Sequence, residues 1–122
     1  MMSTGSGKVY DLEERTYLFA KRVRALVKKI HLSIGNQEEG KQLVRASGSV
    51  GANYIEANEA LSKKDFRMRI KISRKESKES RYWLRLIDLE GTEDLEAERN
   101  ALIQESTELM KIFGAILVKS ET

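Results

Sequence analysis

The sequence predicts an all-α protein with the architecture of an up-down-up-down four-helix bundle, and three observations support this. Proline is absent from the 122 residues, which favours long uninterrupted helices. Apolar residues recur at steps of three and four, whereas the alternation typical of strands is not sustained anywhere. Only short connections separate the periodic segments, so neighbouring helices are expected to run antiparallel.

Start and stop signals place the elements. The four helices are expected near residues 11–34, 36–61, 63–90 and 93–119. Each begins at a polar residue followed by acidic side chains, as at a capped helix N-terminus: Asp11, Asn36, Ser62 and Thr92. Gly35 and Gly91 precede two of these starts, at the position where a glycine commonly ends the preceding helix.

One face of each helix is predicted to form the core. The first segment contributes Leu12, Thr16, Phe19, Val23, Leu26 and Ile30, and the second contributes Leu43, Ser47, Val50, Tyr54, Ala57 and Leu61. The third contributes Phe66, Ile70, Ser73, Ser77, Ser80, Leu84 and Ile87, and the fourth contributes Leu102, Leu109, Ile112, Phe113 and Ile116. Tyr10 and Tyr17 are also expected in the core or against it.

The segment 46–53, "ASGSVGAN", is rich in small residues and lies in the middle of the second helical pattern. Its Gly-Ser-Val-Gly string matches the GxxG clamp of some RNA-binding modules, but that clamp needs a mixed α/β domain. Neither the strand nor the lysine of a phosphate-binding loop is present. We therefore predict a helix surface for close packing, with Ser73, Ser77 and Ser80 as a matching narrow strip on the third helix.

Composition excludes several functional classes. The chain has no cysteine and one histidine, so it offers no thiolate or histidine metal cluster and no catalytic cysteine. No serine has a plausible partner in His31, so a serine–histidine catalytic centre is not expected either. No apolar run approaches the roughly 20 residues that span a bilayer. We expect a cytoplasmic protein without cofactor, metal, membrane partner or enzymatic activity. A single domain is expected over residues 11–120, preceded by a tail over 1–10 that resembles in part an expression-vector remnant.

Charge is distributed unevenly although the net charge is only +3. Residues 63–85 carry ten Lys or Arg against three acids, whereas residues 86–122 carry nine acids against three bases. The predicted nucleic-acid-binding residues lie along one broad side of the third helix: Lys63, Lys64, Arg67, Lys71, Arg74, Lys75, Lys78, Arg81 and Arg85. Such a stripe could follow a phosphate backbone. The alternative is a solvated face neutralised by ion pairs, within its own helix or with the acidic fourth helix.

Several motifs between residues 42 and 83 resemble those of the 23S rRNA-intervening-sequence proteins. In order, these are Gln42 and Arg45, the pair Ser49 and Val50, Asn53 and Glu56, then Ser62, Asp65 and Phe66, and finally Lys75, Glu76, Glu79, Tyr82 and Trp83. The first helix also looks like the opening of this family. One departure is Ala57, where many members have glycine.

The resemblance implies a four-helix bundle that assembles into a homopentameric ring, with no known enzyme activity. Related accessory proteins of diversity-generating retroelements form basic pentamers that bind nucleic acid and a reverse transcriptase. By analogy, we expect an oligomeric accessory protein that binds RNA or DNA through the basic face of its third helix. The alternative is a protein-binding or scaffold bundle without nucleic-acid binding.

Polar and aromatic residues of the same motifs are assigned structural roles. Asn53 and Glu56 are expected to reach Lys or Ser side chains across the second and third helices. The solvated-face alternative includes an ion pair between Glu79 and Lys75. Tyr82 and Trp83 point about 100° apart on a helix. One is expected in the core and the other at a neighbouring subunit, with base stacking on Trp83 as the alternative.

Overall fold

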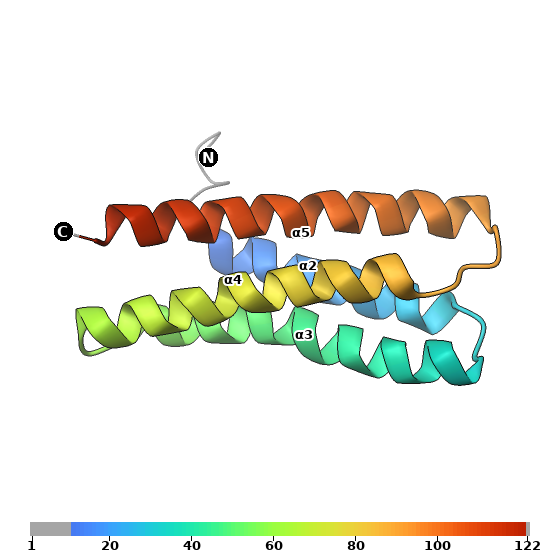
Figure 1. Cartoon of the computed structure of the whole chain (residues 1–122), viewed down its shortest axis with the longest axis horizontal. Helices are drawn as coiled ribbons and strands as arrows, with labels where there is room; N and C mark the ends of the chain where they lie inside the picture. Colours follow the sequence, from blue (N-terminus) through green and yellow to red (C-terminus); the bar gives the residue numbers. More distant parts are fainter. Residues whose placement is uncertain (1–10, 122) are drawn as a thin grey trace.

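The structure, a computed structural model, describes residues 11–121, which form four α-helices and no strand. The helices are α2 (Leu12–Lys29), α3 (Ile34–Asn58), α4 (Lys63–Leu86) and α5 (Glu93–Lys119). Successive helices run in opposite directions, and the packed pairs are α2/α3, α3/α4, α4/α5 and α2/α5 (Figure 1). The predicted all-α, up-down-up-down bundle is confirmed. The predicted tail and Tyr10 lie outside the described residues.

The α2–α3 connection corrects one predicted boundary. Ser33, not Asn36, caps α3, because its side chain accepts a hydrogen bond from the Asn36 N–H at 3.1 Å. The helix therefore begins at Ile34, and Gly35 lies in its first turn instead of ending the preceding helix. Ser62 caps α4 as predicted, whereas Asp11 and Thr92 occupy N-cap positions without a side-chain cap hydrogen bond.

Asn36 instead joins the two connections at one end of the bundle. Its side chain is buried, and its Nδ2 donates to the carbonyls of His31 and Asp88, both at 2.8 Å. Its Oδ1 accepts from the Asp88 N–H at 3.0 Å. One amide side chain thus satisfies three backbone groups that no helix ladder would reach.

The α4–α5 connection begins earlier than predicted, because α4 ends at Leu86. Glu90 and Gly91 both adopt the left-handed conformation there, with φ of 55° and 74°. Gly91 is therefore one of a left-handed pair in the connection, and not the residue that ends α4.

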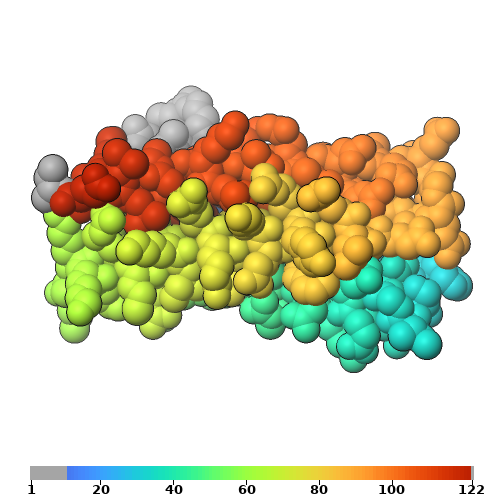
Figure 2. All heavy atoms as spheres, viewed as in Figure 1, coloured from blue at the N-terminus to red at the C-terminus, as the bar shows by residue number. Residues whose placement is uncertain are grey.

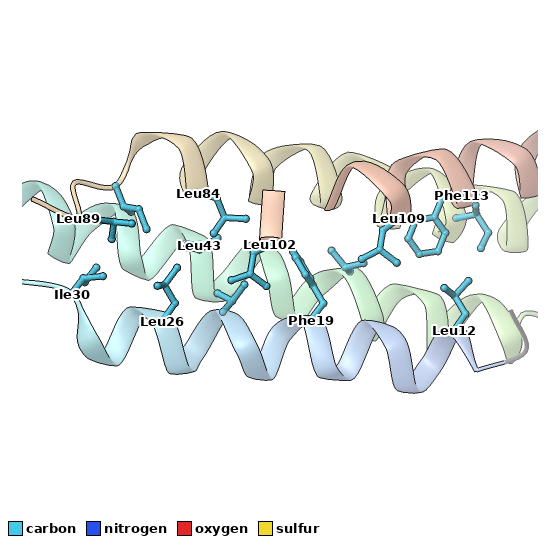
Figure 3. Packing of buried hydrophobic residues seen from close by; sticks show 14 of the residues in the cluster. Leu12, Phe19, Leu26, Ile30, Leu43, Leu84, Leu89, Leu102, Leu109 and Phe113 are labelled. Atoms are coloured by element: carbon cyan, nitrogen blue, oxygen red, sulfur yellow. The ribbon is translucent and has the colours of Figure 1, made fainter. Parts of the chain in front are cut away.

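The core follows the predicted faces closely. Buried apolar side chains from all four helices meet along the bundle axis, including Phe19, Leu43, Leu84 and Phe113 (Figure 3). The core prediction is wrong for two residues. Leu61 is fully exposed because α3 ends before it, at Asn58, and Tyr17 is 56% exposed beside Lys21, on the outward side of α2.

Small residues bring α3 close to both of its neighbours. A Cβ atom at Gly51 would lie only 2.8 Å from Thr16 Oγ1, so α2 crosses α3 at this point. On the other side, the Ser73 hydroxyl of α4 donates to the Val50 carbonyl at 2.9 Å. The predicted small-residue interface is correct for these residues, but Gly48 faces open space.

At both ends of the α4/α5 pair, an arginine of one helix donates hydrogen bonds to the C-terminus of the other. Arg67 of α4 donates to the carbonyl of Leu117 in α5 at 2.7 Å and to the Ser120 hydroxyl. At the opposite end, Arg99 of α5 donates to the Ile87 carbonyl, also at 2.7 Å. Each helix therefore supplies a cation to the negatively polarised C-terminus of the other.

Candidate nucleic-acid interface

The basic residues of α4 cover one broad side of the helix, and only one edge of that side meets α5. At 100° per residue, positions 67, 74 and 81 share a line on the side of α5, and the contacts agree. Arg67 caps α5, and Arg81 donates to Thr107 Oγ1 at 3.3 Å. The Arg74 Nε lies 3.9 Å from the place of a Cβ at Gly114. These three arginines thus lie along the α4/α5 seam, although Arg74 stays exposed.

The remaining predicted cations point outward. This outward basic face consists of exposed residues of α4: Lys64, Lys71, Lys75, Lys78 and Arg85. Among residues 11–121, none of these five side chains makes a hydrogen bond or an ion pair. Lys63, next to Lys64 in the first turn of α4, is also exposed. The surface view shows α4 uncovered along the length of the molecule, next to α5 (Figure 2).

Four of the six acidic residues of α5 pair with arginines outside α4. Arg15 of α2 lies 2.7 Å from Glu105 and 2.8 Å from Glu108. Arg22, also in α2, pairs with Glu98 at 3.2 Å. Within α5 itself, Glu96 pairs with Arg99 at 2.6 Å. In the described part of the chain, no carboxylate of α5 therefore pairs with the five residues of the outward basic face.

Hydrogen bonds shift the pKa values of Arg15 and Glu108 at the contact between α2 and α5. Gln104 and Arg15 both donate to the carboxylate of Glu108, and these bonds lower the pKa of Glu108. The bond from Arg15 to Glu105, with smaller contributions from Glu108, raises the pKa of Arg15 further. The ionised form of Glu108 is therefore favoured, and the ion pairs of Arg15 with Glu105 and Glu108 join α2 to α5.

The residues shared with the family motifs form a polar strip between α3 and α4. Arg45 bridges Glu76 at 3.4 Å and Glu79 at 3.1 Å, and the Glu76 side chain is only 7% exposed. Asn53 accepts from Arg69 at 3.0 Å. The predicted link from Asn53 across the helices is present, but its partner is an arginine and not a Lys or Ser side chain. Glu79 pairs with Arg45, not with the Lys75 of the solvated-face alternative.

The other motif residues have separate places. Asn53 Nδ2 also donates to the carbonyl and hydroxyl of Ser49, both at 2.9 Å, within α3. Glu56 is exposed and its side chain makes no hydrogen bond or ion pair among the described residues, so its expected link across the helices is wrong. Asp65 lies in the first turn of α4, where its backbone N–H donates to the hydroxyl of the N-cap residue Ser62. Phe66 is half-buried against the core.

The two adjacent aromatic residues of α4 differ in exposure. Trp83 is half-buried and packs against the core, whereas Tyr82 is 55% exposed. Their rings meet edge to face, with centroids 4.9 Å apart and an interplanar angle of 81°. The expectation that one of the two rings packs in the core is met by Trp83. The alternative of base stacking on Trp83 is not favoured, because the more accessible ring is that of Tyr82.

Two surface cavities lie near these residues, one beside α4 and one beside α3. A cavity of about 700 Å³ lies between the start of α4 and the end of α5, beside Lys64, Met68 and Lys71. A second, of about 470 Å³, lies between α2 and α3 and is lined mainly by apolar side chains such as Val27 and Val44. Within residues 11–121, no group of three acidic, histidine or cysteine side chains is arranged to hold a metal ion. None of the described helices has an apolar stretch long enough to cross a membrane.

The fold and this surface define a class: a small all-α four-helix bundle with an uncovered basic helix and no described metal site. The family model of the 23S rRNA-intervening sequence proteins matches residues 9–115. The chain belongs to this family. The predicted resemblance is therefore confirmed.

A solved relative supports the same assignment. It is the crystal structure of a protein of unknown function of the S23 ribosomal protein family from Bacteroides thetaiotaomicron VPI-5482. Its sequence is 30% identical, the match covers 86% of this chain and 96% of that chain, and the TM-score is 0.72. Comparison with curated proteins gave no match.

Proposed function

We propose that this protein is a non-enzymatic, oligomeric accessory protein that binds nucleic acid through the outward basic face of α4. The observation that carries the proposal is that five exposed cations stay unpaired while α2 occupies acidic residues of α5. An unpaired row of cations attracts phosphates and releases their condensed counterions. RNA is the first candidate, because the family takes its name from sequences within 23S rRNA.

Self-association into a ring multiplies the basic face, and the outward side of α3 supports such an interface. Val44, Gly48, Ala52 and Ile55 follow helical spacing and are all exposed. A small and apolar stripe of this kind suits close contact with a second copy. The homopentamer implied by the resemblance predicts a native mass five times the 13.9 kDa of the chain. A reverse transcriptase as protein partner stays a prediction.

Binding to a structured RNA and a matched DNA duplex at two salt concentrations tests the proposal. Affinity should fall steeply with salt, with log K changing by about 0.7–0.9 per phosphate contact for each unit of log salt. The triple substitution Lys71→Glu, Lys75→Glu and Lys78→Glu should abolish retention without unfolding the bundle.

The matched control is Lys21→Glu, Arg24→Glu and Lys28→Glu on the exposed side of α2. It changes net charge by the same amount at similar spacing. Loss of binding in the α4 variant alone supports the proposal. Equal loss in both variants, or retention by both, contradicts it.

The alternative function is a protein-binding scaffold, and the exposed apolar residues are the observation in its favour. Native mass spectrometry of Ala52→Glu separates assembly from ligand binding. If this variant dissociates yet the wild type retains no nucleic acid at low salt, the scaffold reading holds. Nucleic-acid retention by the wild type that is lost on reversing α4 leaves the first function in place.

A further inference from the structure

We infer that the outward basic face of α4 binds single-stranded nucleic acid, with one base stacked on the ring of Tyr82. The inference rests on the proposed function and names its ligand class. The first observation is the position of Tyr82 among the cations of α4. Lys71, Lys75, Lys78, Tyr82 and Arg85 follow one another at steps of four and three, which places them along one side of the helix. This line is about 21 Å long at 1.5 Å per residue.

The exposure of Tyr82 makes it available to a ligand. Tyr82 is 55% exposed and lies between Lys78 and Arg85, which make no hydrogen bond or ion pair among the described residues. Leu86, one turn further along, is 46% exposed and extends the apolar surface at this point. An exposed aromatic ring between unpaired cations combines a stacking surface with phosphate contacts.

Trp83 fixes the orientation of this ring before any ligand arrives. The near-perpendicular contact at 4.9 Å covers at most one face of Tyr82, so a second face stays open. Trp83 itself is held against the core. A ring that is already oriented loses little conformational freedom on binding, which favours stacking.

This chemistry selects single strands over duplexes. A base must expose its flat face to stack on Tyr82, and in a duplex those faces are already stacked on neighbouring bases. Stacking is tolerant of sequence because every base has a π face. The cations alone would bind either form, so the preference for single strands depends on the tyrosine.

The test measures binding of a fluorescein-labelled oligouridine and of a labelled RNA hairpin duplex by anisotropy. Tyr82→Ala should weaken oligouridine binding by roughly 5- to 100-fold, while duplex binding changes less than about twofold. Tyr82→Phe keeps the ring and should stay within about twofold of the wild type. The slope of log K against log salt should be unchanged, because no phosphate contact is removed.

Tyr17→Ala is the matched control, because Tyr17 is 56% exposed and also lies beside a lysine, on α2. It should leave both affinities unchanged. A second readout uses the single tryptophan of the chain. Because Trp83 touches Tyr82, stacking of a base there should change Trp83 fluorescence with oligouridine and not with the duplex.

The outcomes separate this inference from the function on which it rests. If the wild type binds neither probe, both fail. If it binds both equally and Tyr82→Ala has no effect, the basic face stands and the stacking inference is wrong. If Tyr82→Ala dissociates the oligomer in light scattering, Tyr82 is an assembly residue, and the inference is wrong for that reason.

Discussion

The guanidinium of Arg67 in α4 donates a 2.7 Å hydrogen bond to the backbone carbonyl of Leu117, in the last turn of α5. This carbonyl also accepts from the Ser120 N–H at 3.2 Å and from the Ser120 hydroxyl at 3.0 Å, so Arg67 adds a charged donor from α4 to the C-terminal cap of α5. Sequence position alone assigned Arg67 to the phosphate-binding stripe. The structure instead gives its half-buried side chain a partner inside the bundle, which leads to the first prediction.

Arg67→Ala should destabilise the bundle while having little effect on nucleic-acid binding. Loss of a charged hydrogen bond to the end of α5 should lower the free energy of unfolding by about 1–3 kcal/mol in urea denaturation. Lys71→Ala is the control and should change stability by less than about 0.5 kcal/mol. A salt dependence of RNA binding that drops in Arg67→Ala and not in Lys71→Ala would reverse this assignment.

Two glycines of α3 should respond with opposite sign to the same substitution. In Gly51→Ala the new methyl would lie 2.8 Å from Thr16 Oγ1, and the free energy of unfolding should fall by about 1–3 kcal/mol. Gly48→Ala meets nothing within 4 Å inside the chain and, measured on the dissociated chain, should raise it by about 1 kcal/mol through helix propensity. Thermal melts of both variants test the pair, and a stabilised Gly51→Ala would show that α2 does not cross there.

Asn36→Ala should be among the more damaging substitutions near either connection. It leaves the carbonyls of His31 and Asp88 and the N–H of Asp88 without their partner. We expect a loss of about 1–3 kcal/mol in chemical denaturation. Gln37→Ala, at the exposed neighbouring position, should stay within about 0.5 kcal/mol. Equal effects of the two would mean that the amide does not join the connections.

Acid should weaken the contact between α2 and α5 through Glu108. Its pKa is lowered in the folded protein by hydrogen bonds from Gln104 and Arg15, so the ionised group favours folding at neutral pH. This contribution is present above the ordinary glutamate pKa of about 4.3 and is lost as the pH falls through the lowered folded value.

The difference in stability between wild type and Glu108→Gln should therefore shrink as the pH falls from 5 to 2.5. Urea titrations across that range measure it. Glu59→Gln, at an exposed site without an ion pair in the described chain, controls for the change in net charge. A difference that stays constant with pH would contradict the role of the carboxylate.

The periodicity of apolar residues was sufficient to predict the helices and most of the core. Val23, Val50 and Leu102 are buried where the spacing places them, because helix geometry is local and repeats every 3.6 residues. Boundaries were less predictable. Ser33 and Asn36 are both good N-cap residues, and only the fold shows that the Asn36 amide is needed by Asp88 across the connection.

The candidate interface was predictable in composition but not in partners. Helical spacing shows that the bases of α4 share a broad side, yet it cannot show that Arg67 and Arg81 meet α5. Nor does it show that Glu105 takes its cation from Arg15, 90 residues away. Pairing across helices depends on the rotation of each helix in the bundle, which the sequence period leaves open.

The arginine caps also bear on how the molecule opens. Because Arg67 and Arg99 connect α4 and α5 at opposite ends, neither helix can fray at its C-terminus without breaking a bond to the other. The two helices should therefore behave as one cooperative unit in native-state hydrogen exchange, with amides at both C-termini protected together. The C-terminal turn of α2, which ends at Lys29 without such a cap, should exchange earlier.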